Sequence, residues 1–235
     1  MLDICCFKWS KPGYRSEFGA YQVNTLRSMV ARHYPAPHRF NCITDDPAGI
    51  DGDIRVIPLW DDFKDRPSPH GGNNPSCFRR LRLWSADVRD LFPGKVLQID
   101  LDMVLVDDVR PLWDRPEPCV LWADNLNPTS PYNGAMQLIT PGEHPVWECF
   151  KADPDAAIKR ASAAGYFGSD QAQLALWLGP NMPRWRAEDG AVSWRVHCNY
   201  GLLPLPSGAK VVNFHGIDDP WNPRRKPAWI KEHYR

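Results

Sequence analysis

The sequence predicts an α/β protein with an open, mixed but mainly parallel sheet and helices on both faces. Three observations predict it: short apolar runs of strand length, segments whose apolar residues recur every three or four positions, and the alternation of these two patterns. The first apolar run is 2–7. Residues 17–33 follow, with Phe18, Leu26 and Val30 near helical spacing. The chain is therefore expected to begin as a strand and an amphipathic helix.

The same alternation continues through the first half. Residues 39–44 and 54–59 are two further strand-like runs, and a loop rich in Gly, Asn and Pro follows them. Ser76 can cap a helix whose apolar positions step by three or four residues as far as Leu91. The strand 96–100 comes next. The order β-α-β-β-α-β is typical of an open parallel sheet.

The second half is also expected to contain both strands and helices. We expect strands at 119–124, 134–140 and 210–215 and helices at 145–164 and 169–179. Ser169 is expected to cap the last helix and Gly179 to end it. No repeat and no long linker divides the chain, which predicts a single domain over residues 1–235.

Composition excludes several functional classes. Lys and Arg total 28 and Asp and Glu total 28, so the net charge is zero and a nucleic-acid or anionic-membrane partner is not expected. No apolar run approaches the about 18 residues of a transmembrane segment. The first residues, MLDICCFKWS, lack the pattern of a signal peptide, and the seven cysteines show no paired metal-ligand spacing. We therefore expect a cytoplasmic protein.

Two carboxylates stand at the end of a strand-like run. Asp100 and Asp102 follow the apolar residues 96–99, and ligands of open α/β sheets bind beyond the carboxyl ends of the strands. Residues i and i+2 of a strand share a face, so this pair is expected to form one oxygen site for Mn²⁺ or Mg²⁺. Such a cation also binds phosphate oxygens. The alternative is a turn-capping Asp100 beside a solvated Asp102.

Five segments carry a resemblance to a known family. They are FRRLRLW (78–84), KVLQIDLDMVLVDDV (95–109), YNGAMQLI (132–139), SDQAQLALWL (169–178) and VVNFHGIDDPW (211–221). In this order they resemble the GT-A fold glycosyltransferases, and among these the glycogenin-like and lipopolysaccharide-galactosyltransferase-like group. The resemblance implies a nucleotide-binding half, 1–109, and a donor-sugar and acceptor half, 110–235.

The resemblance also implies a reaction. A hexosyltransferase of this kind moves a sugar from a nucleotide diphosphate sugar, a UDP-sugar foremost, to a hydroxyl of an acceptor. The acceptor is a saccharide, a lipid-linked sugar or a protein. Mn²⁺ or Mg²⁺ on the diphosphate takes up the charge of the leaving group.

Individual residues receive roles from the resemblance. Asp100 would contact the ribose and the metal, Asp102 would bind the metal, and Arg80 would hold the diphosphate. Asp170 would hold sugar hydroxyls, with Gln171 beside it on the reacting face. Two alternatives stay open: Arg80 as a solvated arginine, and Asp170 as an acid that complements the helix dipole.

The base and the sugars have candidate contacts as well. The base would lie near the first two strands and the donor sugar beside the YNG segment. The candidates are Phe7, Trp9, Tyr14 and Asp45 for the nucleotide, and Asn133, Gly134, Gly216 and Trp221 for the donor sugar and acceptor. Asn-Gly is also a common hairpin turn, so a purely structural role of this pair stays open.

The C-terminal motif departs from the family pattern His-Phe-x-Gly-x-x-Lys-Pro-Trp. Alignment on Gly216 puts Asn213 in place of the histidine and Asp219 in place of the lysine. His215 points the same way as Asn213 in a strand and is the expected third metal ligand. The cations that can replace the lysine are Arg224, Arg225 and Lys226.

Two rival functions remain open. DLDMVL resembles the first motif of haloacid-dehalogenase phosphatases, with Asp100 and Asp102 as nucleophile and acid/base and Asp218-Asp219 as a late acidic pair. That motif normally lies on the first strand, and Met103 replaces its usual glycine. The altered C-terminal motif also allows a non-catalytic module that binds nucleotide sugars.

Overall fold

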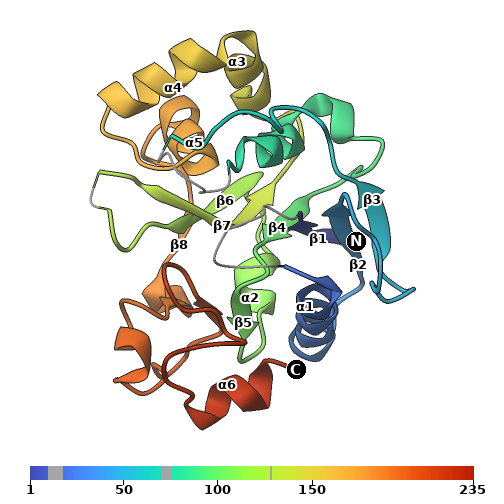
Figure 1. Ribbon diagram of the computed structural model, residues 1–235, viewed down its shortest axis with the longest axis vertical. Helices are drawn as coiled ribbons and strands as arrows, with labels where there is room; N and C mark the ends of the chain where they lie inside the picture. Colours follow the sequence, from blue (N-terminus) through green and yellow to red (C-terminus); the bar gives the residue numbers. More distant parts are fainter. Residues whose placement is uncertain (10–17, 70–75, 128) are drawn as a thin grey trace.

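The computed structural model describes residues 1–9, 18–69, 76–127 and 129–235. It confirms the mixed α/β class (Figure 1). A seven-stranded sheet has the order β3-β2-β1-β4-β7-β6-β8, and a smaller sheet has the order β5-β10-β9. The predicted nucleotide contact Tyr14 lies outside the described residues.

The first half forms the parallel part of the large sheet. Its elements are β1 (Leu2–Lys8), α1 (Ala20–His33), β2 (His38–Thr44), β3 (Arg55–Pro58) and β4 (Val96–Ile99). β1 pairs in parallel with both β2 and β4. Side chains of β1 alternate between two cores, with Ile4 and Cys6 in one and Cys5 and Phe7 in the other. Both faces of the sheet are therefore covered.

The second half extends the sheet with reversed strands. β7 (Tyr132–Ile139) is antiparallel to β4 on one side and to β6 (Cys119–Ala123) on the other. β8 (Arg184–Trp185) adds to β6 in parallel. A chain that leaves β4 therefore returns alongside it, which brings residues of the second half to the end of β4.

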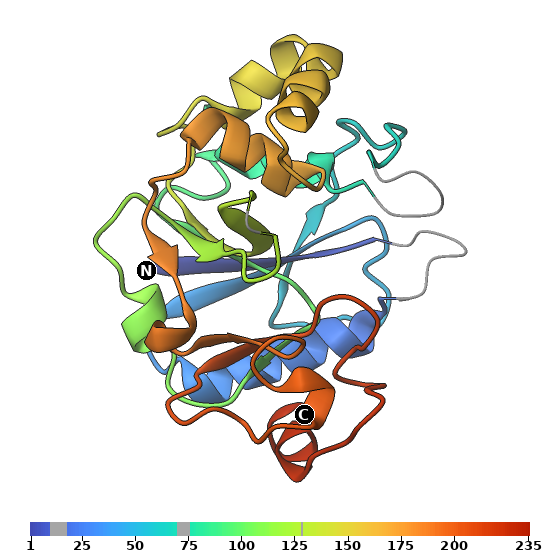
Figure 2. The same cartoon turned by 90° about the vertical axis from the view of Figure 1, so that its left-hand side faces the viewer.

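Helices cover the two faces in separate layers (Figure 2). One layer holds α3 (Val146–Ala152), α4 (Pro154–Ala163) and α5 (Asp170–Leu178). The other holds α1, the small sheet of β5 (Met103–Leu105), β9 (Ala191–Ser193) and β10 (Val211–Asn213), and α6 (Ala228–His233). Short elements complete the fold: α2 (Arg110–Trp113), η3 (Ala187–Asp189) and η4 (Asn199–Gly201).

The predicted helix from Ser76 to Leu91 is wrong in type. The segment forms two 3₁₀ helices, η1 (Phe78–Trp84) and η2 (Ala86–Val88). Ser85 separates them because its backbone is extended, and its hydroxyl accepts a hydrogen bond from the Asp87 amide at 3.1 Å. Cys77, not Ser76, is the N-cap position of η1.

Two further boundaries differ from the expectation. The helix predicted at 145–164 is divided at Asp153, whose carboxylate caps α4 by accepting from the Ala156 amide at 3.0 Å. The Asp100–Asp102 segment is not one strand. β4 ends at Ile99, residues 101–102 form a turn, and Met103 begins β5 in the other sheet. Alternation along a single strand therefore does not set the directions of Asp100 and Asp102.

Candidate active site

Three of the predicted site residues form one charged cluster beyond the carboxyl end of β4. Asp100 directly follows β4, Arg80 lies in η1, and Asp170 begins α5. Arg80 Nε donates to Oδ2 of Asp170 at 2.8 Å, and Nη2 lies 2.6 Å from the same oxygen. Arg80 Nη1 donates to Oδ1 of Asp100. A single guanidinium therefore joins two carboxylates that are far apart in the sequence.

Charge compensation explains why Asp100 is tolerated there. Burial raises the pKa of Asp100 to about 6, and the positive charge of Arg80 acts against this shift. Burial disfavours the charged form of Arg80, but Asp100 and Asp170 outweigh it, so the pKa of Arg80 is raised and the guanidinium stays charged. Asp100 and Arg80 thus keep each other ionised in a site that is largely shielded from water.

A residue that the sequence analysis did not single out orients Asp100. Gln98, which is buried in β4, donates from Nε2 to Oδ1 of Asp100 at 2.8 Å. Arg80 binds the same oxygen, so both hydrogen bonds fall on Oδ1. Gln98 stands two residues before Asp100 within the predicted strand 96–100, and that spacing in the sequence could have indicated this contact.

Gly134 lies against the charged cluster. A Cβ atom at this position would stand 2.7 Å from Arg80 Nη2 and 3.1 Å from Asp170 Oδ2. The register of β6 and β7 shifts here, from Leu121 opposite Gln137 to Trp122 opposite Asn133. The hairpin-turn alternative for Asn133-Gly134 is therefore wrong, because both residues lie within β7. Only a residue without a side chain leaves room for the Arg80–Asp170 pair.

Asn133 and the start of α5 hold the backbone around the cluster. Asn133 Oδ1 accepts a hydrogen bond from the Ala135 amide at 2.8 Å, inside the irregular part of β7. Ser169 does not cap α5 with its side chain, contrary to the prediction; its hydroxyl instead accepts from the Cys77 amide at 3.0 Å. This bond ties α5 to η1, the two elements that carry Asp170 and Arg80.

Gln171 follows Asp170 in the first turn of α5. Its Nε2 donates to the Phe167 carbonyl at 3.0 Å. Gly168 has a φ of 106°, and a Cβ there would stand 2.3 Å from Gln171 Cγ. The side chain of Gln171 is therefore folded back over the preceding loop. Among the described residues it forms no hydrogen bond with Arg80, Asp100 or Asp170.

The C-terminal motif contains a buried amide with unused polar atoms. Asn213, the last residue of β10, is 1% exposed, and within the described ranges neither Oδ1 nor Nδ2 has a hydrogen-bond partner. The adjacent Phe214 amide donates to the Asp102 carbonyl at 3.0 Å, so the motif lies directly beside Asp102. A buried unpaired amide is costly, and this position calls for a ligand or an ordered water.

His215 has a partner within the protein. Its Nε2 lies 2.7 Å from Ser193 Oγ, and the same oxygen accepts from the Val196 amide at 3.2 Å. Burial, followed by the charges of Arg195 and His197, lowers the pKa of His215 to about 4, so the imidazole is neutral at physiological pH. In the described part of the chain, no three His, Cys, Asp or Glu side chains converge in a way that could hold a metal ion.

The candidate nucleotide contacts differ in exposure. Phe7 is buried, and the rings of Trp9 and Trp60 meet it edge-on at 6.0 and 5.9 Å between centroids. Trp9 is half-buried and Asp45 is exposed. Of these residues, Trp9 and Asp45 have surface left for a ligand.

The charged residues that follow the motif differ in whether they have partners within the protein. Asp218 is fully buried and accepts from Trp194 Nε1 and Arg224 Nε, each at 2.8 Å. Arg224 is therefore committed to Asp218. Arg225 donates to the Tyr200 carbonyl at 3.4 Å. Lys226 forms no ion pair within the described residues, so of the three cations proposed to replace the lysine it is the uncommitted one.

Gly216 and Trp221 flank this segment. Gly216 has a φ of 96°, which favours glycine, and it is exposed. Trp221 is half-buried between Phe18 and Tyr234, with ring centroids 5.8 and 6.1 Å away. Both residues lie on the same stretch of chain as Asn213, and among the described residues neither has a ring contact or hydrogen bond with Arg80.

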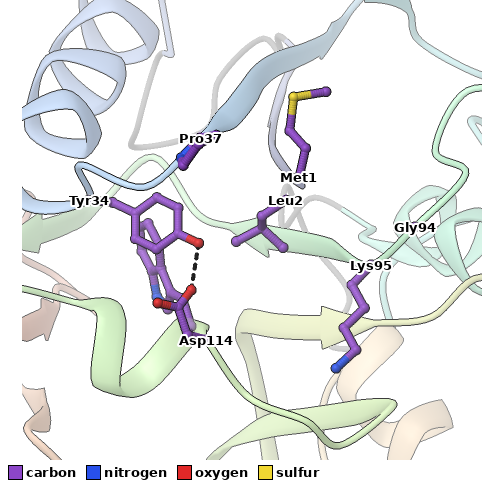
Figure 3. Close-up of a pocket in the computed structure, with 8 residues that line it drawn as sticks. Met1, Leu2, Tyr34, Pro37, Gly94, Lys95 and Asp114 are labelled. Atoms are coloured by element: carbon purple, nitrogen blue, oxygen red, sulfur yellow. Dashed lines mark hydrogen bonds between the residues drawn. The ribbon is translucent and has the colours of Figure 1, made fainter.

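A separate cavity lies at the opposite end of the strands of the large sheet (Figure 3). Its volume is about 390 Å³, and its lining includes Leu2, the first residue of β1, and Lys95, which directly precedes β4. Tyr34 closes one side by donating to Asp114 at 2.7 Å. This cavity therefore belongs to the amino ends of the strands and is not part of the charged cluster.

Comparisons with known proteins agree with this architecture. No protein-family model matches the sequence, and no curated protein is similar to it at the sequence level. Solved structures do match. The galactosyltransferase LgtC, in complex with donor and acceptor sugar analogues, is 19% identical over 93% of this chain and 89% of its own, with a TM-score of 0.60.

Two longer glycosyltransferases match as well. GlyE of Streptococcus pneumoniae TIGR4 is 14% identical over 98% of this chain, with a TM-score of 0.60, and the match spans 60% of GlyE. The bifunctional WbbM is 12% identical over 92% of this chain, with a TM-score of 0.54, and the match spans 46% of WbbM. The chain therefore has the GT-A fold of these glycosyltransferases, as the resemblance in its sequence predicted.

Proposed function

We propose that this chain is a glycosyltransferase that moves a hexosyl group from a nucleotide diphosphate sugar, most simply a UDP-sugar, to the hydroxyl of an acceptor. The observation that carries the proposal is the Arg80 cluster: two carboxylates and a guanidinium gathered at the carboxyl ends of the strands around a glycine of β7. The fold supports the same reading, since LgtC was solved with donor and acceptor sugar analogues.

Within this proposal the cluster binds the donor sugar. Asp170 and Asn133 are the hydrogen-bond acceptors for sugar hydroxyls, and Gly134 leaves room for Arg80 and Asp170 to pair beside the ring. A carboxylate at this place also stabilises the positive charge that develops on a sugar during transfer. Arg80 binds Oδ2 of Asp170, and the other oxygen, Oδ1, accepts a hydrogen bond from the Ser169 hydroxyl at 3.5 Å. Trp9 and Asp45 are the proposed contacts of the base.

A divalent cation fits the oxygen atoms beside this cluster. Asp100 and Asp102 supply carboxylates, and the buried Asn213 amide has an oxygen with no partner. Such hard oxygen ligands suit Mg²⁺ or Mn²⁺. His215 Nε2 already contacts Ser193, so we favour Asn213 over His215 as the third ligand. The cation would neutralise the diphosphate as it leaves.

We place the protein in the cytoplasm. All seven cysteines are free, which fits a reducing compartment. No helix in the described ranges is long and apolar enough to cross a membrane.

The test is turnover of a panel of nucleotide sugars with Mn²⁺, measured as release of nucleoside diphosphate. Asp170→Asn is expected to abolish release while the fold is kept, and Asp90→Asn, an exposed carboxylate outside the cluster, serves as the matched control. Hydrolysis of p-nitrophenyl phosphate that disappears in Asp100→Asn, with no nucleotide-sugar turnover, would establish the phosphatase instead. Tight binding of a nucleotide sugar without any turnover would establish the binding module.

A further inference from the structure

A cavity of about 450 Å³ lies between the start of α1 and the C-terminal segment. Its lining includes three aromatic residues and two lysines: Tyr21, Trp221, Lys226, Lys231 and Tyr234. The remaining walls are mostly proline and aliphatic side chains. The volume is in the range of small-molecule sites and matches a mono- or disaccharide better than a polymer.

The three aromatic rings form one continuous wall. The ring centroids of Tyr21 and Tyr234 are 6.2 Å apart, and those of Trp221 and Tyr234 are 6.1 Å apart. Tyr21 is 60% exposed, so much of its surface is available to a ligand. Aromatic rings with a polar edge suit sugars, because the C–H face of a pyranose packs on the ring while the hydroxyls stay solvated.

Several polar groups of this cavity have no partner among the described residues. Neither Lys226 nor Lys231 forms an ion pair or hydrogen bond with another described residue, and both are exposed. The hydroxyl of Tyr234, a residue only 6% exposed, is buried and has no hydrogen-bond partner among the residues that the structure describes. Two lysines without a partner among the described residues, placed in one small cavity, attract an anion.

The cavity of Figure 3 shows the contrast. There the Tyr34 hydroxyl donates to Asp114, and Lys95 Nζ donates to the Arg115 carbonyl at 2.5 Å and the Pro116 carbonyl at 2.9 Å. The Tyr34 hydroxyl and the Lys95 ammonium are thus already bound by the protein itself. The cavity on the C-terminal segment, in contrast, combines aromatic walls with two lysines that have no partner among the described residues.

This cavity is also close to the proposed donor site. α6, which carries Lys231, packs against β5, whose first residue follows Asp102. Pro220, another lining residue, directly follows Asp219. Tyr234 is near enough to both carboxylates that they, after burial and Tyr21, contribute to raising its pKa. A ligand in the cavity therefore lies beside the Asp102 turn.

We propose that this cavity is the acceptor subsite and that it binds an anionic saccharide, one that carries a phosphate or a carboxylate. The sugar ring packs on Tyr21 and Trp221, and Lys226 and Lys231 bind the anionic group. The subsite deepens the proposed function, on which the word acceptor rests. Binding of the anionic sugar itself does not depend on that function.

Calorimetry without nucleotide or metal tests the subsite directly. Glucose 6-phosphate and glucuronate are the phosphate and carboxylate probes, and at least one is expected to bind. Glucose alone and inorganic phosphate alone are expected to bind at least about tenfold more weakly than that probe, because each offers only half of the recognised chemistry. Lys226→Gln, Lys231→Gln and Tyr21→Ala are each expected to weaken binding about tenfold, the scale of one charge-assisted hydrogen bond or ring contact.

Lys159→Gln on α4 is the matched control, since Lys159 is an exposed lysine on the opposite layer, and it is expected to leave binding unchanged. The proposal is overturned if neither probe binds, if inorganic phosphate binds as tightly as the sugar phosphate, or if UDP with Mn²⁺ displaces the probe. Probe binding in a protein that turns over no nucleotide sugar would keep the subsite and reject the proposed function. Turnover of a nucleotide sugar without probe binding would keep the proposed function and reject the subsite.

Discussion

Arg80 contacts Asp170 through two nitrogens, with Nε 2.8 Å and Nη2 2.6 Å from the single oxygen Oδ2. Both side chains are buried, and the third nitrogen of the guanidinium binds Asp100. A buried pair of this kind stabilises little by itself, but the loss of one partner leaves the other as an unpaired buried charge. The pair therefore couples the first half of the chain, in η1, to the second half, in α5.

Removal of Arg80 is expected to destabilise the protein strongly. Arg80→Met leaves Asp100 and Asp170 without their cation, and a loss of about 3 kcal/mol in the free energy of unfolding is expected. The double variant Arg80→Met/Asp170→Asn removes one of the stranded charges and is expected to recover part of this loss. Denaturant unfolding of the two single variants and the double variant measures the coupling. Strictly additive losses would contradict the pairing.

Gly134→Ala is expected to abolish donor turnover while the protein still folds. The new methyl group would stand 2.7 Å from Arg80 Nη2, so the guanidinium must move away from Asp170 or β7 must shift. Nucleotide release and the melting temperature are measured together. The matched control is Gly52→Ala, since a Cβ at Gly52 meets nothing within 4 Å. Equal activity of the two variants would show that the close approach has no functional role.

Removal of divalent metal is expected to stop turnover. In the proposed function the diphosphate of the donor faces Asp100 and Asp102, and like charges repel unless a cation lies between them. Excess EDTA should abolish nucleotide release, and Mn²⁺ or Mg²⁺ should restore it. Full activity in excess chelator would reject the metal-dependent reading and leave Arg80 as the cation that faces the leaving group.

Replacement of Asn213 is expected to affect metal binding more than replacement of His215. Mn²⁺ affinity, measured by calorimetry, should fall at least about tenfold in Asp102→Asn and Asn213→Ala, since each loses an oxygen ligand. His215→Ala should change it less, because Nε2 of His215 contacts Ser193. The reverse order, with His215→Ala the weaker binder, would restore the imidazole as the ligand that the sequence analysis expected.

The sequence predicted the longer strands of the large sheet, but not the short strands β5, β8 and β9 or the helix type of η1. Strands such as β1 and β2 are apolar runs of strand length, and burial on both faces leaves few other structures for them. In η1, Phe78, Leu81 and Trp84 are spaced by three residues, which suits a 3₁₀ helix as well as an α-helix. The sequence Asp153-Pro154, a capping residue followed by a proline, could have indicated the division between α3 and α4.

The candidate site was predictable in its residues but not in their partners. Arg80, Asp100 and Asp170 were each expected near a ligand, and the sequence did not indicate that they bind one another. That contact depends on the reversal of β7 and on the packing of η1 against α5, which are long-range events. Burial of the Asn213 amide is of the same kind, because it follows from the pairing of β10 with β5.

The antiparallel pairing of β4 with β7 also matters while the chain is being synthesised. β4 is buried along its whole length, and its outer edge is covered by residues that stand more than thirty positions later, with Val96 opposite Ile139 and Ile99 opposite Met136. A nascent chain that has emerged only as far as residue 109 therefore presents an apolar strand with an unpaired backbone edge, the form most prone to pair with another molecule. The strand β7, which carries Gly134, is thus also the strand that covers the exposed edge of β4 and protects it from aggregation.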